Sequence, residues 1–299
     1  MINTTVNNIL VPLNLTAEGR NSIKQAMMIH EKFNAKITFL YIIPMKNLLT
    51  RLFHPIGQIR YKHNAVRDLE EYVSEYYGGK IPEFVRLKVK RGTIVRIVIS
   101  LISAIRYDLI IINKKLEQRT GLLQNWESGI KLIAGEAFCP VLIFNDIPTE
   151  SDINEILVPI EINRRHKHNI VWAIELAQRY NADVHLVSVL NSKIRIEKSR
   201  IYRKVSRIKK WVAKSNISCE VTFLRSSNNK PHQVIAEYIN QAKKDLALIM
   251  THQEAILDIN SIGDMASEVI TESEQPVFVI TPKKETLITI LIDVLKTKK

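Results

Sequence analysis

Five consecutive cationic or imidazole side chains occupy positions 164–168: Arg164, Arg165, His166, Lys167 and His168. They follow a β-branched run at 155–160 and precede apolar residues at helical spacing, so we expect them at the start of a helix. Because a helix N-terminus is already positive, guanidinium groups beside it can hold an anion. Arg164 and Arg165 are therefore candidate anion ligands. The alternative is that they are solvated, since each charge there costs only about 0.3–1 kcal/mol.

The segment 193–214 concentrates ten Lys and Arg residues against the single acid Glu197. Its apolar residues recur at helical spacing, which predicts an amphipathic helix with a basic outer face: Ile201, Val205, Ile208 and Val212. We expect the outer face to carry Arg203, Lys204, Arg207 and Lys210, with Tyr202 and Trp211 nearby as stacking groups. Such a face can bind RNA or an anionic lipid surface with strong salt dependence. The alternative is a solvated helix face, because the sequence contains no recognisable nucleic-acid-binding motif.

Catalytic and metal constellations are not evident. His166 and His168 are two positions apart and cannot share a helix face. Cys139 and Cys219 lack the spacing of a zinc site or of a disulfide framework. No Ser or Cys nucleophile stands with a base and an orienting carboxylate. We therefore predict no metal site and no catalytic residue.

The strands and helices that must position these residues occur twice along the sequence, as two copies of one pattern. Ile9 to Asn14 returns as Ile156 to Glu161, and the same displacement of 147 continues through the following helix and strand. Later segments match at displacements of 137 and 136, so only the middle of each copy changed length. In each copy, runs of β-branched residues alternate with stretches whose apolar residues recur at helical spacing. This alternation of strands and helices predicts parallel βαβ units. We expect domains at 1–147 and 152–282, joined by the short polar segment 146–152, so that the two domains touch.

The remaining residues, 283–299, form an extension with apolar residues between lysine-rich ends. The extension is too short to span a bilayer. We expect it to form a helix or a strand that docks on the domain or on a partner subunit. The alternative is an amphipathic anchor at a membrane interface.

The bulk composition is that of a globular protein with two cores: 299 residues, 46% hydrophobic and 24% charged. The formal net charge of +13 is compatible with nucleic acid, anionic lipid or acidic protein partners. No leader-like or membrane-spanning run is evident, and the two cysteines suit a reducing compartment, so we expect a cytoplasmic protein.

Three motifs, each present in both copies, carry a family resemblance. They are the opening Ile-Leu-Val-Pro run, an Asp-Leu strand at Asp108 and again at Asp245, and a final strand preceded by Pro140 and again by Pro276. Together they resemble the universal stress protein (UspA-like) family in tandem, over nearly the whole chain. The resemblance implies an α/β fold with two doubly wound domains of the Rossmann-like, adenine nucleotide alpha hydrolase-like kind. Each domain would have a five-stranded parallel sheet with helices on both faces, and the domains would pair face to face.

Many members of that family bind ATP through an Asp after the first strand and a Gly-x2-Gly-x9-Gly-Ser/Thr loop after the fourth. This chain departs from the pattern in both copies. The first copy places Asn14, Asn113, Leu116, Glu127 and Ser128 at those positions. The second copy places Glu161, Met250, Gln253, Gly263 and Asp264 there. Asn14 and Glu161 can still accept a hydrogen bond from a base or ribose, whereas an acid in the loop repels phosphate.

The sequence thus predicts a non-catalytic stress-response protein with degenerate ATP-binding motifs and no required cofactor, acting through a protein partner, self-association or a weakly held ligand. One alternative is an ATP or adenine-nucleotide switch that uses the second domain and hydrolyses ATP slowly. The other is an RNA or lipid binder that uses the basic helix at 193–214.

Overall fold

The structure is a computed structural model and describes residues 2–43, 55–116, 126–145, 153–162, 166–191, 196, 199–226, 231–242, 244–251 and 262–281. The predicted joint at 146–152 and the extension at 283–299 lie outside these residues. The elements of the first half are β1 (Asn8–Leu13), α1 (Ala17–Phe33), β2 (Lys36–Ile43), α3 (Pro55–Tyr76), β3 (Val85–Arg91), α4 (Ile94–Ala104), β4 (Leu109–Asn113), α5 (Trp126–Glu136) and β5 (Val141–Phe144).

The second half repeats this order. Its elements are β6 (Glu155–Pro159), α6 (Lys167–Tyr180), β7 (Asp183–Asn191), α7 (Arg200–Ala213), β8 (Cys219–Ser226), α8 (Pro231–Ala242), β9 (Leu246–Met250), α9 (Asp264–Glu272) and β10 (Val277–Ile280). The duplicated α/β fold predicted from the repeat is confirmed, and so are the five parallel strands in each unit that the family resemblance implied.

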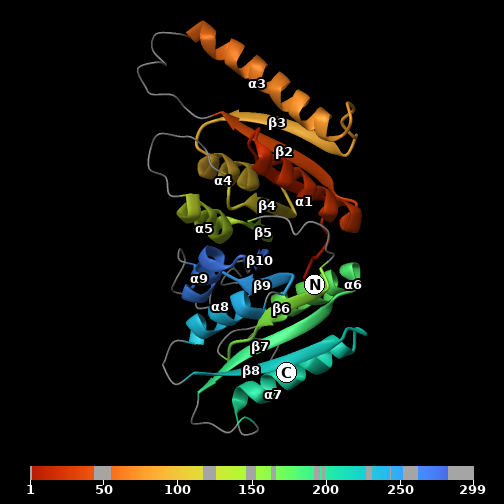
Figure 1. Ribbon diagram of the computed structural model, residues 1–299, viewed down its shortest axis with the longest axis vertical. Coiled ribbons are helices and arrows are strands. Elements are labelled where there is room, and N and C mark those ends of the chain that lie inside the picture. The colour runs from red at the N-terminus through yellow and green to blue at the C-terminus, as the bar shows by residue number, and fades with distance from the viewer. Residues whose placement is uncertain are drawn as a thin grey trace, which may run out of the picture.

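One continuous ten-stranded sheet runs through both halves in the order β3-β2-β1-β4-β5-β10-β9-β6-β7-β8 (Figure 1). Pairing is parallel within each half, and β5 meets β10 antiparallel, with Val141 opposite Val279. The two halves therefore join edge to edge rather than face to face. Each half thereby covers the open strand edge of the other, which would otherwise expose unpaired backbone groups.

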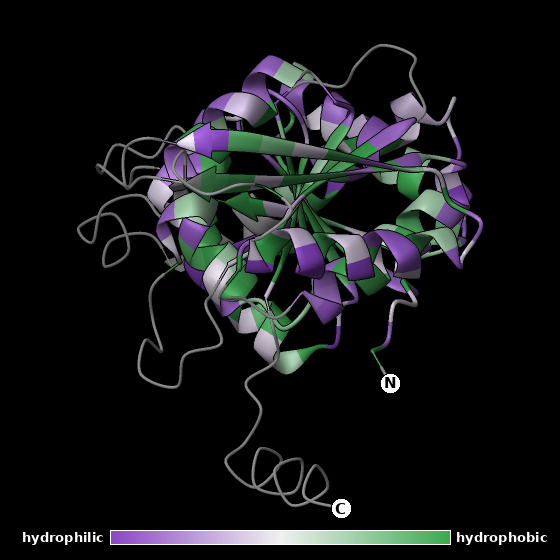
Figure 2. Cartoon of the chain, turned by 90° about the horizontal axis from the view of Figure 1, so that it is seen from below, coloured by the Kyte–Doolittle hydropathy of each residue, from purple (hydrophilic) through white to green (hydrophobic). Residues whose placement is uncertain are grey.

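Helices cover both faces of the sheet. The apolar residues form two clusters, one under α1, α3, α6 and α7, and the other under α4, α5, α8 and α9. Figure 2 shows the strands as an apolar centre between helices whose outer surfaces are hydrophilic. Within the part of the chain that the structure describes, no helix combines the length and apolar character needed to cross a membrane.

Local sequence signals explain several element ends. Asn34 and Asn181 adopt the left-handed conformation after α1 and α6, and their N–H groups bond to the carbonyls of His30 and Ala177. Asparagine tolerates this conformation better than most residues, so it ends both helices in the same way. Pro55 is the first residue of α3, a position that suits proline.

The basic helix is shorter than predicted. It begins at Arg200 rather than near Lys193, because the Ser199 hydroxyl accepts a hydrogen bond from the N–H of Tyr202 and caps the helix. Residues 193–195 and 197–198 lie outside the described part of the chain. The predicted apolar stripe is confirmed, since all four of its residues are buried.

Candidate functional site

The sheet order reverses between β1 and β4 in the first half and between β6 and β9 in the second. In doubly wound folds ligands bind at this switch point, outside the carboxyl ends of the strands. Asn14 follows β1 and Asn113 ends β4, while Glu161 follows β6 and Met250 ends β9. Most sequence-predicted nucleotide positions in the described residues therefore lie at or near one of two equivalent switch points, which we call the first and the second crevice. The side chains around each crevice decide what it can bind.

In the first crevice the polar groups already bind to the protein. Asn113 is fully buried, and its amide donates to the Glu18 carbonyl at 3.2 Å and accepts from the N–H of Lys115 at 2.8 Å. The Asn14 side-chain oxygen accepts from the Thr16 hydroxyl at 2.7 Å. Leu116, at the second glycine position of the family motif, is buried as well. Asn113 thus fastens β4 to the first turn of α1.

The turn after β1 is closely packed beneath α3. A Cβ atom added at Gly19 would lie 2.0 Å from the Asn14 carbonyl oxygen, so only glycine fits there. The Tyr72 hydroxyl of α3 donates to the Thr16 carbonyl of the same turn. Burial, as the main cause, raises the pKa of Tyr72 to about 12 and keeps it a donor.

An acidic side chain stands at the start of α5. Glu127 accepts a 2.9 Å hydrogen bond from Lys131 on the same helix and a 2.8 Å bond from the Thr271 hydroxyl of α9. These bonds, chiefly the one from Lys131, lower the pKa of Glu127 and keep it ionised. Ser128, the predicted phosphate ligand, is exposed beside it. A phosphate at this helix end would face the Glu127 carboxylate.

The second crevice is closed in a related way. Met250 fills the end of β9 and is 2% exposed. Gly263 is the N-cap of α9, but its N–H donates to the Thr251 carbonyl at 2.7 Å. Asp264 follows as the first residue of the helix and is exposed. The one glycine that the motif retains therefore bonds to the protein, next to a carboxylate. Gln253 lies outside the described residues.

Backbone groups around Glu161 are bound by neighbouring side chains. Lys204 of α7 donates to the carbonyls of Glu161 and Ile162, at 2.8 and 3.0 Å. The His166 Nε2 atom lies 2.8 Å from the Glu161 carbonyl oxygen, and His166 is buried. Lys204 therefore folds back on the turn instead of joining the outward basic face on which the sequence placed it. Arg164 and Arg165 lie outside the described residues.

The outer face of α7 carries an uninterrupted basic stripe, which we define as Arg200, Arg203, Arg207, Lys210 and Lys214. These residues recur three or four positions apart, share one side of the helix and are all exposed. Tyr202 and Trp211, 38% and 37% exposed, flank the stripe. The sequence from 200 to 214 contains no acid. This arrangement can attract a polyanion.

A cleft of about 560 Å³ opens between the halves, and sequence reasoning did not foresee it. Its lining combines residues from the amino ends of β4 and β5 with residues from α6 and β10, among them Arg106, Asp108, Phe138, His168 and Trp172. Asp108 serves the fold, because its carboxylate accepts hydrogen bonds from the N–H groups of Asn7 and Asn8 at 3.0 and 3.1 Å. The antiparallel pairing of β5 with β10 brings the two sides of this cleft together. No local sequence pattern predicts that pairing.

Neither cysteine is poised as a nucleophile. Burial raises the pKa of Cys139 to about 12 and that of Cys219 to about 11, so both thiols are protonated at neutral pH. A separate cluster was missed by sequence reasoning: Glu155, His185 and Glu220 come together from β6, β7 and β8. The signal that could have found it is the alternation of these strands, which turns the three residues toward one face.

Comparisons with known proteins bear on the fold. No family model matches the sequence, and no curated protein matches it. The structure is similar to a universal stress protein from Archaeoglobus fulgidus, with a TM-score of 0.68 and 17% identity, over 92% of this chain and 98% of that one. It is also similar to a putative universal stress protein from Pseudomonas aeruginosa, with a TM-score of 0.60 and 16% identity, over 98% and 99% of the two chains.

A third similar structure is the cytoplasmic domain of a prokaryotic cation chloride cotransporter, with a TM-score of 0.50 and 14% identity, over 96% and 99% of the two chains. All three matches extend across both halves of this chain. The tandem duplication, the strand order and these full-length matches lead to one conclusion: the chain has the fold of the universal stress proteins, repeated in tandem.

Proposed function

We propose that this protein is a non-catalytic binding protein of the stress-protein type in which neither half binds the phosphates of ATP. The observation that carries the proposal is the hydrogen bond from the Gly263 N–H to the Thr251 carbonyl, beside the carboxylate of Asp264. Phosphate binding at a helix start needs free N–H donors and no competing negative charge. At the start of α9 the N–H of Gly263 already bonds to the protein, and Asp264 places a carboxylate beside it, so neither condition is met.

The first half supports the same proposal independently. Asn113 and Leu116 replace glycines whose backbone would approach a phosphate, and both side chains are packed inside the protein. Glu127 remains ionised at the start of α5. Ligand contacts that remain compatible with this geometry are those of a base or ribose near Asn14 or Glu161. An ATP switch in the second domain has less support, because the contacts of Gly263 and Met250 oppose it.

The test starts with the full chain purified under native conditions without added nucleotide. The protein is denatured, the released small molecules are identified by mass spectrometry, and ATP is then titrated into the apo protein by calorimetry. We expect no ATP or ADP to be released and no heat of ATP binding. Recovery of ATP or ADP near one per chain would overturn the proposal, and a loss of that binding in Glu161→Ala would then establish the switch.

A second candidate function, RNA binding, rests on the basic stripe of α7. Five exposed cations along one helix face, with no acid between them, create a local positive potential over the whole helix. Tyr202 and Trp211 offer exposed rings on which unpaired bases can stack. The cotransporter domain with a similar fold shows only that the fold occurs within a larger protein.

Binding of a single-stranded RNA should weaken steeply with salt, with a slope of roughly −0.7 per phosphate contact. Replacing Arg203 and Arg207 together by Glu should abolish binding. The matched control replaces Lys90 and Arg96, two exposed cations of the first half, by Glu and gives the same change in net charge. Equal effects of the two double variants would show that only net charge matters. Binding to anionic vesicles but not to RNA would assign the stripe to lipid.

A further inference from the structure

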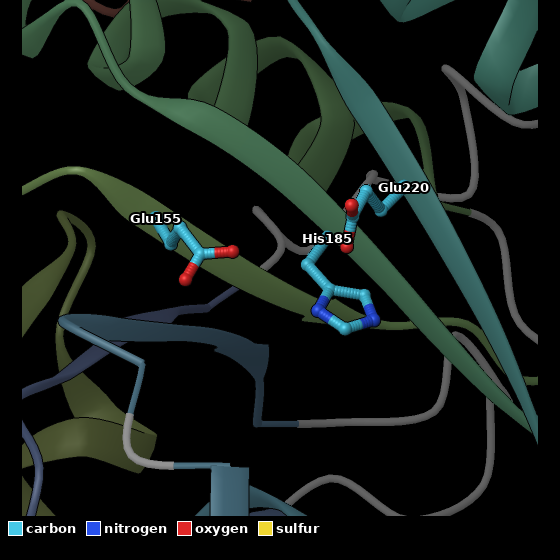
Figure 3. Close-up of side chains that lie close together, drawn as sticks. All are labelled: Glu155, His185 and Glu220. Carbon is cyan, nitrogen blue, oxygen red and sulfur yellow. The ribbon is translucent and has the colours of Figure 1, made fainter.

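Glu155, His185 and Glu220 lie on one face of the sheet near the amino ends of three adjacent strands (Figure 3). His185 is the register partner of Glu220, and Leu157, two residues after Glu155, is the register partner of His185. Because side chains alternate along a strand, this register sends all three to the same side. The cluster therefore lies at the amino ends of the strands, whereas the nucleotide crevices lie at the carboxyl ends. It is independent of the proposed function.

His185 is held in a defined orientation. It is only 5% exposed, and its Nε2 atom lies 2.8 Å from the hydroxyl oxygen of Thr222 on β8. The ring of Tyr238 packs edge-on against it, with the ring centroids 6.0 Å apart. Nε2 is therefore occupied, and Nδ1 is the nitrogen that remains for the cluster.

The Nδ1 atom is buried and has no hydrogen-bond partner among the described residues. A buried polar atom without a partner costs free energy, so a native protein seldom retains one without a use. In Figure 3 one ring nitrogen faces the carboxylate of Glu155 while the other points away from it. Since Thr222 holds Nε2, the nitrogen that faces the carboxylate is Nδ1.

The ligand atoms of the three residues lie within 4.8 Å of one another. One imidazole nitrogen and two carboxylate oxygens are ligands that zinc and related divalent cations accept. Metal–ligand bonds of about 2.1 Å would draw such atoms to roughly 3.4 Å from one another. Glu220 is exposed and can rotate to close this gap, whereas His185 is already fixed. Thr222 then acts as the partner that orients a ligating histidine through its second nitrogen.

Lys244 occupies part of the same space. Its amine donates to both carboxylate oxygens of Glu155, at 2.6 and 2.5 Å, so it already places a positive charge beside the cluster. A divalent cation would compete with this amine for Glu155. Removal of the Lys244 charge should therefore strengthen metal binding.

The first half of the chain shows that the fold does not require this cluster. At the repeat displacement of 147, Asn8 and Thr38 stand where Glu155 and His185 stand. Arg86 occupies the place of Glu220, because Val85 and Cys219 pair with equivalent residues of β2 and β7. The same architecture therefore forms with none of the three ligands. The three residues are a property of the second half alone.

We propose that Glu155, His185 and Glu220 form a binding site for a divalent cation of the zinc type, with His185 Nδ1 as the fixed ligand. Three protein ligands leave a further coordination position for water or for a partner's side chain. The site couples the first strand of the second half to its edge strand β8. A bound cation would hold the edge of the sheet in place.

The test uses the full chain without an affinity tag, freed of metal by a chelator and titrated with Zn²⁺ or Co²⁺. We expect about one Co²⁺ per chain, with visible absorption typical of low coordination number, and displacement by Zn²⁺. His185→Gln and Glu220→Gln should abolish this spectrum, whereas Lys244→Met should raise the affinity by about tenfold. His63→Gln removes an exposed histidine of α3 and serves as the matched control.

Glu220 is exposed, so Glu220→Gln should keep the wild-type circular dichroism spectrum and unfolding midpoint even if His185→Gln does not fold. Two results would overturn the proposal. One is the absence of the Co²⁺ spectrum in the wild-type protein. The other is binding that persists unchanged in both Glu220→Gln and His185→Gln, which would place the ion elsewhere on the chain.

Discussion

The amine of Lys114, just after β4 in the first half, donates a 2.7 Å hydrogen bond to the carbonyl of Ser273, just after α9 in the second half. A second, longer bond of 3.4 Å reaches the carbonyl of Thr271. A cation at the C-terminal end of a helix is stabilised by the helix dipole. Lys114 thus connects the two halves on the face of the sheet covered by α5 and α9, and its environment makes its charge sensitive to pH.

Burial, the main cause, lowers the pKa of Lys114 from 10.5 to about 8, and nearby Glu127 opposes that shift. Between these two values the unfolded chain binds a proton that the folded chain does not. The contribution of Lys114 to the free energy of unfolding should therefore rise with pH from about 8 to about 10.5, and it should not change with pH below about 8.

We expect the difference in free energy of unfolding between wild type and Lys114→Met to change by about 1–2 kcal/mol across that window, after allowance for solvent screening. Denaturant unfolding of both proteins at several pH values measures this difference. A difference that stays constant with pH would contradict the prediction.

Asp245 fastens the start of the second half in the way that Asp108 fastens the first. Its carboxylate accepts hydrogen bonds from the N–H groups of Asn154 and Glu155, at 2.8 and 3.0 Å. Asp245→Asn should lower the free energy of unfolding by about 1–3 kcal/mol, because charge-assisted bonds to the backbone weaken. Asp183→Asn, at an exposed strand start, is the matched control and should change stability little.

Asp264 should both stabilise α9 and repel phosphate. Asp264→Ser should lower the free energy of unfolding by about 0.3–1 kcal/mol, because an acid is lost from the helix start. The same change should give a measurable gain in affinity for inorganic phosphate or ATP. Asp264→Asn separates the effect of charge from that of the hydroxyl. If neither variant binds better than wild type, the carboxylate is not what keeps phosphate away.

Ser199 determines where the basic helix starts. Removal of its cap in Ser199→Ala should lower the free energy of unfolding by about 1 kcal/mol. Fraying at Arg200 and Arg203 should also reduce any RNA affinity of the basic stripe without any loss of charge. Ser206→Ala, in the middle of the same helix, is the control for loss of a hydroxyl. Equal effects of the two variants would argue against capping as the cause.

Local patterns in the sequence predicted most of the elements. The β-branched run predicted at 155–160 forms β6, and the apolar residues at helical spacing after it form α6, because both patterns are clear in the sequence. The start of α7 was wrong, because positive charge continues past the capping Ser199 and hides the boundary. The prediction for Lys204 was wrong for a related reason. The helical period shows on which side of the helix a residue lies, but it does not show which loop a long side chain can reach.

By itself the sequence determined the duplication, the alternation of strands and helices, and the loss of glycines at the nucleotide crevices. These features depend on residues close together in the chain, or on a comparison of one half with the other. Tertiary structure alone decided that β5 pairs with β10, and that His185 meets Glu155 and Glu220 from neighbouring strands. Strand neighbours and register arise from packing between distant segments, which no local period encodes.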